Sequence, residues 1–153
     1  MLGEITLPKF SAPPKIILSL LSGINNIFLG SNTGGHAITA NNCVVIGANA
    51  MSIGDSSNVI IIGNHAGQNN STDNNIFIGA ECGFNNTSGT NNLFVGTNSG
   101  YTNTIGYSNI FMGYNAGYTN DGNFNLFFGF HSVTIFWTTK TAAFGRITSV
   151  RRT

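Results

Sequence analysis

Short apolar runs recur along the middle of this chain at a nearly constant spacing. Seven runs of three apolar residues each end in a glycine, and these glycines follow one another at steps of 17, 16, 16, 17, 17 and 16 residues. A fixed period this short indicates one small structural unit stacked on copies of itself. The unit is too short for a helix with its connections, so we predict a strand and its turns. The corner glycines, as we call them, are Gly30, Gly47, Gly63, Gly79, Gly96, Gly113 and Gly129.

The residues around each corner glycine also repeat. Asparagine stands before the apolar run in five units, and the third residue after the corner glycine is always small. A second glycine follows one position later in five of the seven units. Asn-rich turns close each unit, and asparagine both suits left-handed turns and can hydrogen-bond along a stack of strands. We therefore expect an all-β fold, a parallel β-solenoid of about seven coils of 16–17 residues, over residues 25–133.

The side chains of a strand alternate between its two faces. The first and third residues of each run therefore share a face, which we assign to the coil interior, and the middle residue then points outward. Seven outward side chains would form an apolar stripe, which soluble monomers rarely leave in water, so we predict a subunit interface. The alternative is the inverted assignment, in which the middle residues fill the coil. The predicted interface residues are Phe28, Val45, Ile61, Phe77, Phe94, Phe111 and Phe127.

The two ends of the chain differ from this body. Residues 1–24 hold all three prolines, and residues 134–153 lose the glycine pattern. Because an exposed last coil would template further strands, we interpret both ends as caps or as joints to neighbouring subunits.

Charge is scarce and unevenly placed. Charged residues make up 7% of the chain, and no lysine or arginine lies between residues 16 and 139. Nucleic-acid binding needs a basic stripe along the contact surface, so we do not expect it of the repeats. No apolar stretch approaches the ~20 residues of a membrane span. The apolar stretch at residues 16–21 follows two lysines, but Pro13-Pro14 interrupts the approach, so we predict no signal peptide.

Residues able to carry chemistry are few and scattered. His65 and His131 share one repeat position four layers apart, and the acidic residues form no pair at a shared position. Cys43 and Cys82 fall at different points of units two layers apart, so we expect two free thiols. No zinc motif, phosphate loop or Ser-His-Asp spacing occurs. We therefore predict no catalytic residue, no metal and no cofactor.

Two families carry similar repeats. Asn42-Cys43-Val44-Val45-Ile46-Gly47 resembles the head repeats of trimeric autotransporter adhesins, which follow an Asn-Ser-Val-Ala-Ile-Gly pattern. Asn109-Ile110-Phe111-Met112-Gly113-Tyr114-Asn115-Ala116-Gly117-Tyr118 is similar to Asn-Asn-Ile-Phe-Ile-Gly repeats in fibre-like proteins of bacteria, phages and large viruses. The resemblance implies a left-handed parallel β-roll with three chains packed about a common axis. The heptad stalk and four-strand membrane anchor of the adhesins have no counterpart here.

Together these features favour a structural protein over an enzyme. We expect a homotrimeric fibre or spike module of a virion or an extracellular fibre, with a surface ligand that the sequence does not identify. The alternative is a subunit of a self-polymerising filament that stacks end to end. A discrete trimer would support the first interpretation and open-ended polymers the second.

Overall fold

The computed structural model describes residues 16–17, 23–132 and 141–144 of the 153-residue chain, and these contain strands and turns but no helix. The rest of the predicted end segments, 1–24 and 134–153, lies outside the described residues. The strands are β1 (Ile16–Ile17), β2 (Ile27–Leu29), β3 (Val44–Ile46), β4 (Ile60–Ile62), β5 (Ile76–Ile78), β6 (Leu93–Val95), β7 (Ile110–Met112), β8 (Asn125–Phe128) and β9 (Thr141–Phe144).

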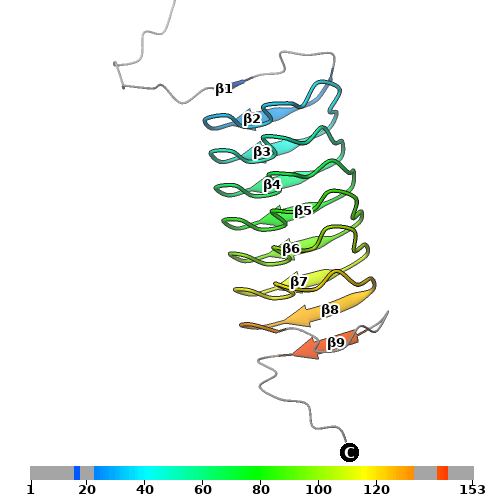
Figure 1. The fold of residues 1–153 in the computed structure, drawn as a ribbon. Coiled ribbons are helices and arrows are strands. Elements are labelled where there is room, and N and C mark those ends of the chain that lie inside the picture. Colours follow the sequence, from blue (N-terminus) through cyan, green and yellow to red (C-terminus); the bar gives the residue numbers. More distant parts are fainter. Residues whose placement is uncertain (1–15, 18–22, 133–140, 145–153) are drawn as a thin grey trace, which may run out of the picture.

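All nine strands form one sheet in sequence order (Figure 1). The seven strands β2 to β8 are parallel and in register, so the middle residues Phe77, Phe94 and Phe111 pair directly with one another. These strands make a solenoid of about six turns, which confirms the predicted parallel β-solenoid. At the two ends, β1 pairs antiparallel with β2, and β9 pairs parallel with β8.

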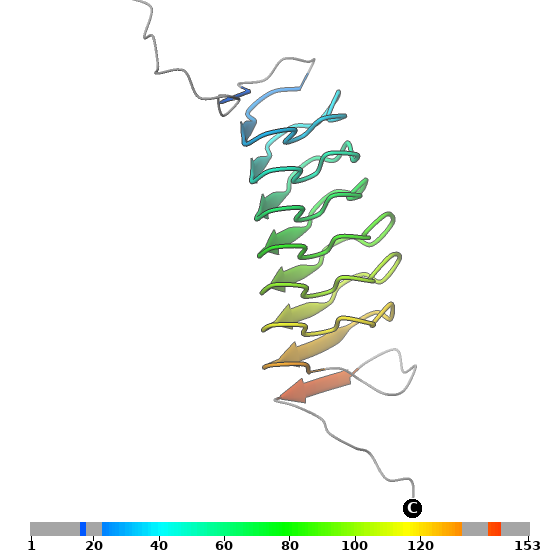
Figure 2. The same ribbon diagram turned by 60° about the vertical axis from the view of Figure 1, so that its left-hand side comes forward.

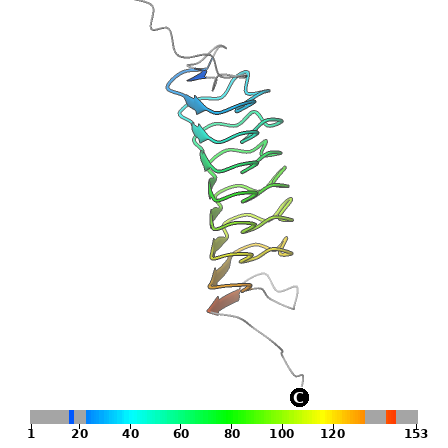
Figure 3. The same ribbon diagram turned by 90° about the vertical axis from the view of Figure 1, so that its left-hand side faces the viewer.

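Each coil has a strand side and a loop side. The strands stack along one side of the molecule and the connecting loops return along the other (Figures 2 and 3). The corner glycines end the strands with φ between 114° and 143°, which L-residues rarely adopt. A Cβ on Gly79 would lie 2.6 Å from the carbonyl carbon of Gly96 in the next coil. The corners are therefore glycine for two reasons, conformation and close backbone approach, as the spacing predicts.

Two further positions of every coil are left-handed. The second residue after the corner glycine has φ between 51° and 57° in all seven coils, and this position holds both His65 and His131. The residue two positions before each apolar run has φ between 55° and 62°, and is asparagine in five coils. Asparagine tolerates this conformation better than other non-glycine residues, so local conformation accounts for much of the asparagine content.

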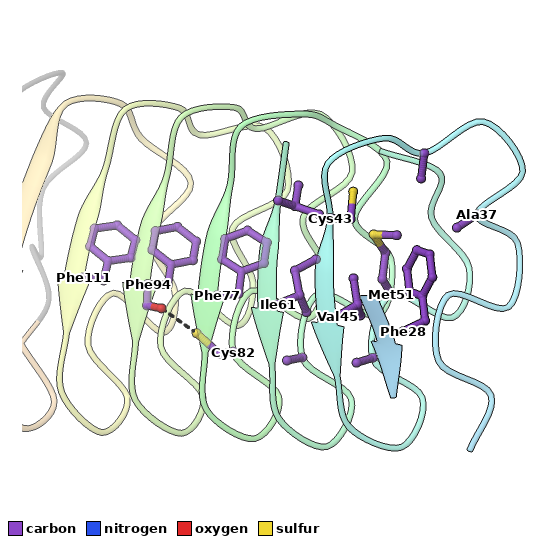
Figure 4. Packing of buried hydrophobic residues seen from close by; sticks show 14 of the residues in the cluster. Phe28, Ala37, Cys43, Val45, Met51, Ile61, Phe77, Cys82, Phe94 and Phe111 are labelled. Atoms are coloured by element: carbon purple, nitrogen blue, oxygen red, sulfur yellow. Dashed lines mark hydrogen bonds between the residues drawn. The ribbon is translucent and has the colours of Figure 1, made fainter. Parts of the chain in front are cut away.

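The middle strand residues form the central column of a core that one chain encloses. Six of the middle strand residues have no exposed surface, and Phe28 at the N-terminal end exposes 6%. The rings of Phe77, Phe94, Phe111 and Phe127 stack on one another with centroids 4.6–5.1 Å apart. Figure 4 shows the first three of these rings in line. The predicted outward orientation is therefore wrong, and the inverted assignment is correct. A subunit interface formed by Phe28, Val45, Ile61, Phe77, Phe94, Phe111 and Phe127 is excluded, because these side chains already lie inside the coil.

The second glycine of each unit explains why phenylalanine fits inside. A Cβ on Gly83 would lie 2.7 Å from the ring of Phe77, and one on Gly34 would lie 2.7 Å from the ring of Phe28. In one described coil the second glycine is replaced by Met51. The middle strand residue of that coil is Val45, which is smaller than phenylalanine. Both side chains are fully buried (Figure 4). In this coil the side chain at the second position fills interior space beside the smaller Val45.

Buried asparagines satisfy the backbone between the strands and the loops. Asn92 Oδ1 accepts a hydrogen bond from the Asn109 backbone N–H (2.9 Å), and its Nδ2 donates to the Gly106 carbonyl (2.8 Å). Asn75 and Asn109 make the same pair of bonds one coil before and one coil after. The predicted bonding of asparagines along the stack is confirmed, and it joins each coil to the next.

Candidate interaction face

The outer face of the sheet consists of the first and third residues of strands β2 to β7 and of the matching Leu126 and Phe128 of β8. All are apolar, and all are partly or largely exposed, because the middle residues point into the coil and their neighbours point away from it. The most exposed are Ile27 at 51%, Ile110 at 40%, Phe128 at 40%, Leu29 at 39%, Ile60 at 38% and Ile78 at 37%. The sheet thus presents two parallel columns of apolar side chains to water.

The area of the outer face is large for a monomer. Side chains of this size offer on the order of 150–200 Å² each when fully exposed, so two columns about one-third exposed leave roughly 800 Å² in water. The largest apolar patch on a typical monomer is roughly 300–600 Å², whereas each side of a standard interface is about 800 Å². The outer face therefore has the size and character of one side of a protein–protein interface.

Sequence reasoning predicted an apolar interface but missed these residues. One unit carries a signal, because Val45 there accompanies Met51 in place of the second glycine. The other units do not follow this exchange, since Ile61 keeps Gly67 and Phe127 is followed by Val133. The sequence pattern therefore does not decide which face of the strand lies inside.

The carboxylates of the coils are occupied by backbone donors. Asp121 accepts hydrogen bonds from the backbone N–H groups of Thr104, Ile105 and Gly106 at 2.7–3.3 Å and from the Thr104 hydroxyl at 2.7 Å. Asp55 binds Thr39 in the same way. These aspartates thus hold the turn of the preceding coil, and no group of three His, Cys, Asp or Glu residues able to hold a metal occurs within the described residues.

The histidines belong to the same system of coil-to-coil contacts. His65 Nδ1 lies 2.5 Å from Gln68 Oε1, and its Nε2 lies 3.3 Å from Asn49 Nδ2 in the preceding coil. His131 Nε2 lies 3.3 Å from Asn115 Nδ2. Each histidine therefore continues, in a left-handed position, the amide-to-amide bonds that asparagines such as Asn32 and Asn49 make with one another.

Both cysteines are free, as predicted, and both are buried. Burial raises the pKa of the Cys82 thiol far above its ordinary value, and its Sγ donates to the Phe94 carbonyl (3.3 Å, Figure 4). Burial also raises the pKa of the Cys43 thiol, against hydrogen bonds from the backbone. Since the thiolate is the reactive form, neither thiol is suited to act as a nucleophile.

A column of aromatic side chains runs along the coils after the second glycine. Phe84, Tyr101 and Tyr118 stack with ring centroids 5.1 Å apart and planes within 16° of parallel. Rings stacked in this way cover one another's faces and present their edges to solvent. A flat ligand would find a free ring face only at the ends of this column, so the column serves to join coils rather than to form a stacking platform.

Comparison of the chain with models of protein families, with curated proteins and with solved structures finds no match. Within the described residues no helix has the length and apolar character needed to cross a membrane.

Proposed function

We propose that this chain is a structural fibre or spike module, in which three copies pack side by side through their outer faces and no reaction is catalysed. The observation that supports this function is the continuous apolar outer face. A face of roughly 800 Å² matches one side of a standard protein–protein interface, and burying it would remove a large apolar surface from water.

The two columns of the outer face suit a ring of three. A closed trimer needs two different patches on each chain, because each copy contacts its neighbours through unlike surfaces. The first-residue column, with Ile27 and Ile60, and the third-residue column, with Leu29 and Ile78, are two such patches. The resemblance to adhesin heads, whose three chains share an axis, supports the same number.

A rod of this kind acts through its shape, and the proposed setting is a virion or an extracellular fibre. Attachment to a surface ligand would use the exposed Asn, Thr and Tyr side chains of the loops. The scattered and occupied carboxylates, histidines and thiols support a role without catalysis.

The end-to-end filament is the less favoured arrangement. At the N-terminal end of the stack, β1 pairs with Phe28 and Leu29 and runs opposite to every other strand. An incoming coil would need that edge free and parallel. Lateral packing through the outer face needs no such rearrangement.

The mass of the native protein in solution tests the proposal. Light scattering should give about three times the 16.2 kDa of one chain. Replacing Ile27, Ile60 and Ile110 by threonine should yield monomers that keep their β-sheet circular dichroism, because these side chains face outward and threonine suits strands.

The matched control replaces exposed isoleucines away from the sheet. Ile53 and Ile38 expose 55% and 53% of their surface in the loops, and their replacement by threonine should leave the trimer intact. A wild-type chain that is monomeric at micromolar concentration would refute the proposal. A discrete dimer would keep the outer face as the interface and refute the trimer.

A further inference from the structure

The columns that flank the outer face change character in the last two coils. The position directly after the corner glycine is small or polar in the first five coils, from Ser31 to Thr97, and then becomes Tyr114 and Phe130. The position two residues before each apolar run is asparagine in five coils and serine in the sixth, and in the last coil it is Phe124. We call Tyr114, Phe124, Phe128 and Phe130 the aromatic end; each exposes between 40% and 55% of its surface.

Phe124 stands in an unfavourable backbone conformation. Its φ is 58°, close to the values of the asparagines at the same position of other coils, such as Asn58 at 55° and Asn91 at 57°. A bulky residue in the left-handed region costs roughly 1–2 kcal/mol. The ring packs edge-on against Tyr107 at 5.1 Å and still leaves 46% of the residue in water. Asparagine would suit this backbone position better, so the phenylalanine here is a departure from the repeat that the backbone does not favour.

The repeating part of the outer face fixes the alignment of two copies poorly. Strands β2 to β6 each offer a pair of aliphatic side chains of similar size, so sliding one copy by one coil, about 4.8 Å, replaces each contact by a similar one. Alignment is strongly specified only where the pattern is not repeated. Among the described coils, the outer face and its flanks lose their repeat at the aromatic end.

We propose that the aromatic end is a self-recognition surface that sets the axial alignment of the copies; this inference rests on the proposed function. The surface is continuous with the outer face through Phe128 and carries no charged residue, so it fits the same occupant, a second copy of this chain. In the aligned assembly the aromatic ends meet. A slip by one coil sets Phe130 or Tyr114 against the smaller residues of an earlier coil and leaves rings exposed.

The test restores the repeat residues at three positions, as Tyr114→Thr, Phe124→Asn and Phe130→Thr. Each new residue already occurs at the same position of another coil, and asparagine suits the backbone of Phe124 better, so the variant should fold. A spin label on Ile53→Cys, which lies in an exposed loop, reports distances between chains by pulsed electron paramagnetic resonance. The wild-type assembly should give one narrow set of distances, and the triple variant should add further distances, offset axially by multiples of about 5 Å.

The control replaces Ile38 and Ile105, exposed apolar residues outside the aromatic end, by threonine and should keep the narrow distances. A triple variant that keeps them as well would overturn the inference and leave the proposed function intact. A triple variant that falls apart into monomers would also overturn it, because the aromatic end would then supply association rather than alignment. A wild-type chain with no distances between chains and the mass of a monomer would refute the proposed function itself.

Discussion

The interiors of the early and the late coils are built differently around the same backbone. The coils of β3 and β4 are filled by side chains of varied shape, among them Val45, Met51, Val59 and Ile61. The coils of β6 and β7 repeat one ring and one amide, with Phe94 and Phe111 stacked 4.6 Å apart and Asn92 and Asn109 bonded in sequence. The comparison shows that the same coil backbone accommodates interior side chains of different shape and size.

Replacing the interior residues of a late coil by those of an early coil should have the largest effect on the free energy of unfolding. Gly83→Met places a Cβ 2.7 Å from the Phe77 ring and should lower the free energy of unfolding by about 3 kcal/mol or more. Phe77→Val leaves a cavity and should cost about 2–4 kcal/mol. The double variant recreates the pair found at Val45 and Met51 and should regain at least half of the summed loss. Urea unfolding at one protein concentration gives the coupling energy, and strict additivity would show that the two positions do not share one space.

Breaking the amide series of the late coils should have the next largest effect. Asn92→Val copies the apolar residue Val59 of an early coil but leaves the Asn109 N–H and the Gly106 carbonyl without their partner. Each unsatisfied buried group costs about 1–3 kcal/mol, so we expect a loss of about 2–4 kcal/mol. Asn91→Gly is the control, because Asn91 is exposed with φ of 57°, and glycine should cost little there. Equal losses for the two variants in thermal unfolding would contradict the interior role of Asn92.

The smallest expected effect is on the pH dependence of the free energy of unfolding, and it should be larger for Cys82 than for Cys43. Folding raises the pKa of Cys82 far above its ordinary value of 9.0, so the folded chain keeps a proton that the unfolded chain loses at high pH. Stability contributed by this thiol is therefore complete below pH 9 and falls above it, by up to about 1.4 kcal/mol per pH unit. Between pH 8 and 10, Cys82→Ser should remove more of this slope than Cys43→Ala. An unchanged slope in the serine variant would exclude the thiol as its cause.

Much of the fold follows from the sequence because its signals are local and repeated. The corner glycines mark both a positive φ and a contact with the next coil, and seven evenly spaced copies leave little room for another interpretation. The small position before the second glycine is buried in every coil, from Thr33 to Ser132, as its constant size predicts.

The orientation of the strands could not be read from alternation alone. A run such as Ile76-Phe77-Ile78 is apolar on both faces, so either face satisfies the pattern. The deciding quantity is the width of the coil, which admits one column of rings because the second glycine leaves space for each ring. The width of the coil is a tertiary property that the sequence does not show. It places the middle residues inside, so the candidate interface consists of the first and third residues of each run.

Contacts between coils are carried almost entirely by residues at equivalent positions, from corner on corner to ring on ring and amide on backbone. A segment of 16 or 17 residues therefore carries the residues for the contact with the coil before it and with the coil after it. A tandem copy inserted in frame would pack on the original through these same contacts. Lengthening this molecule by internal duplication is accordingly a smaller evolutionary step than altering a single corner, where any added carbon collides with the coil beside it.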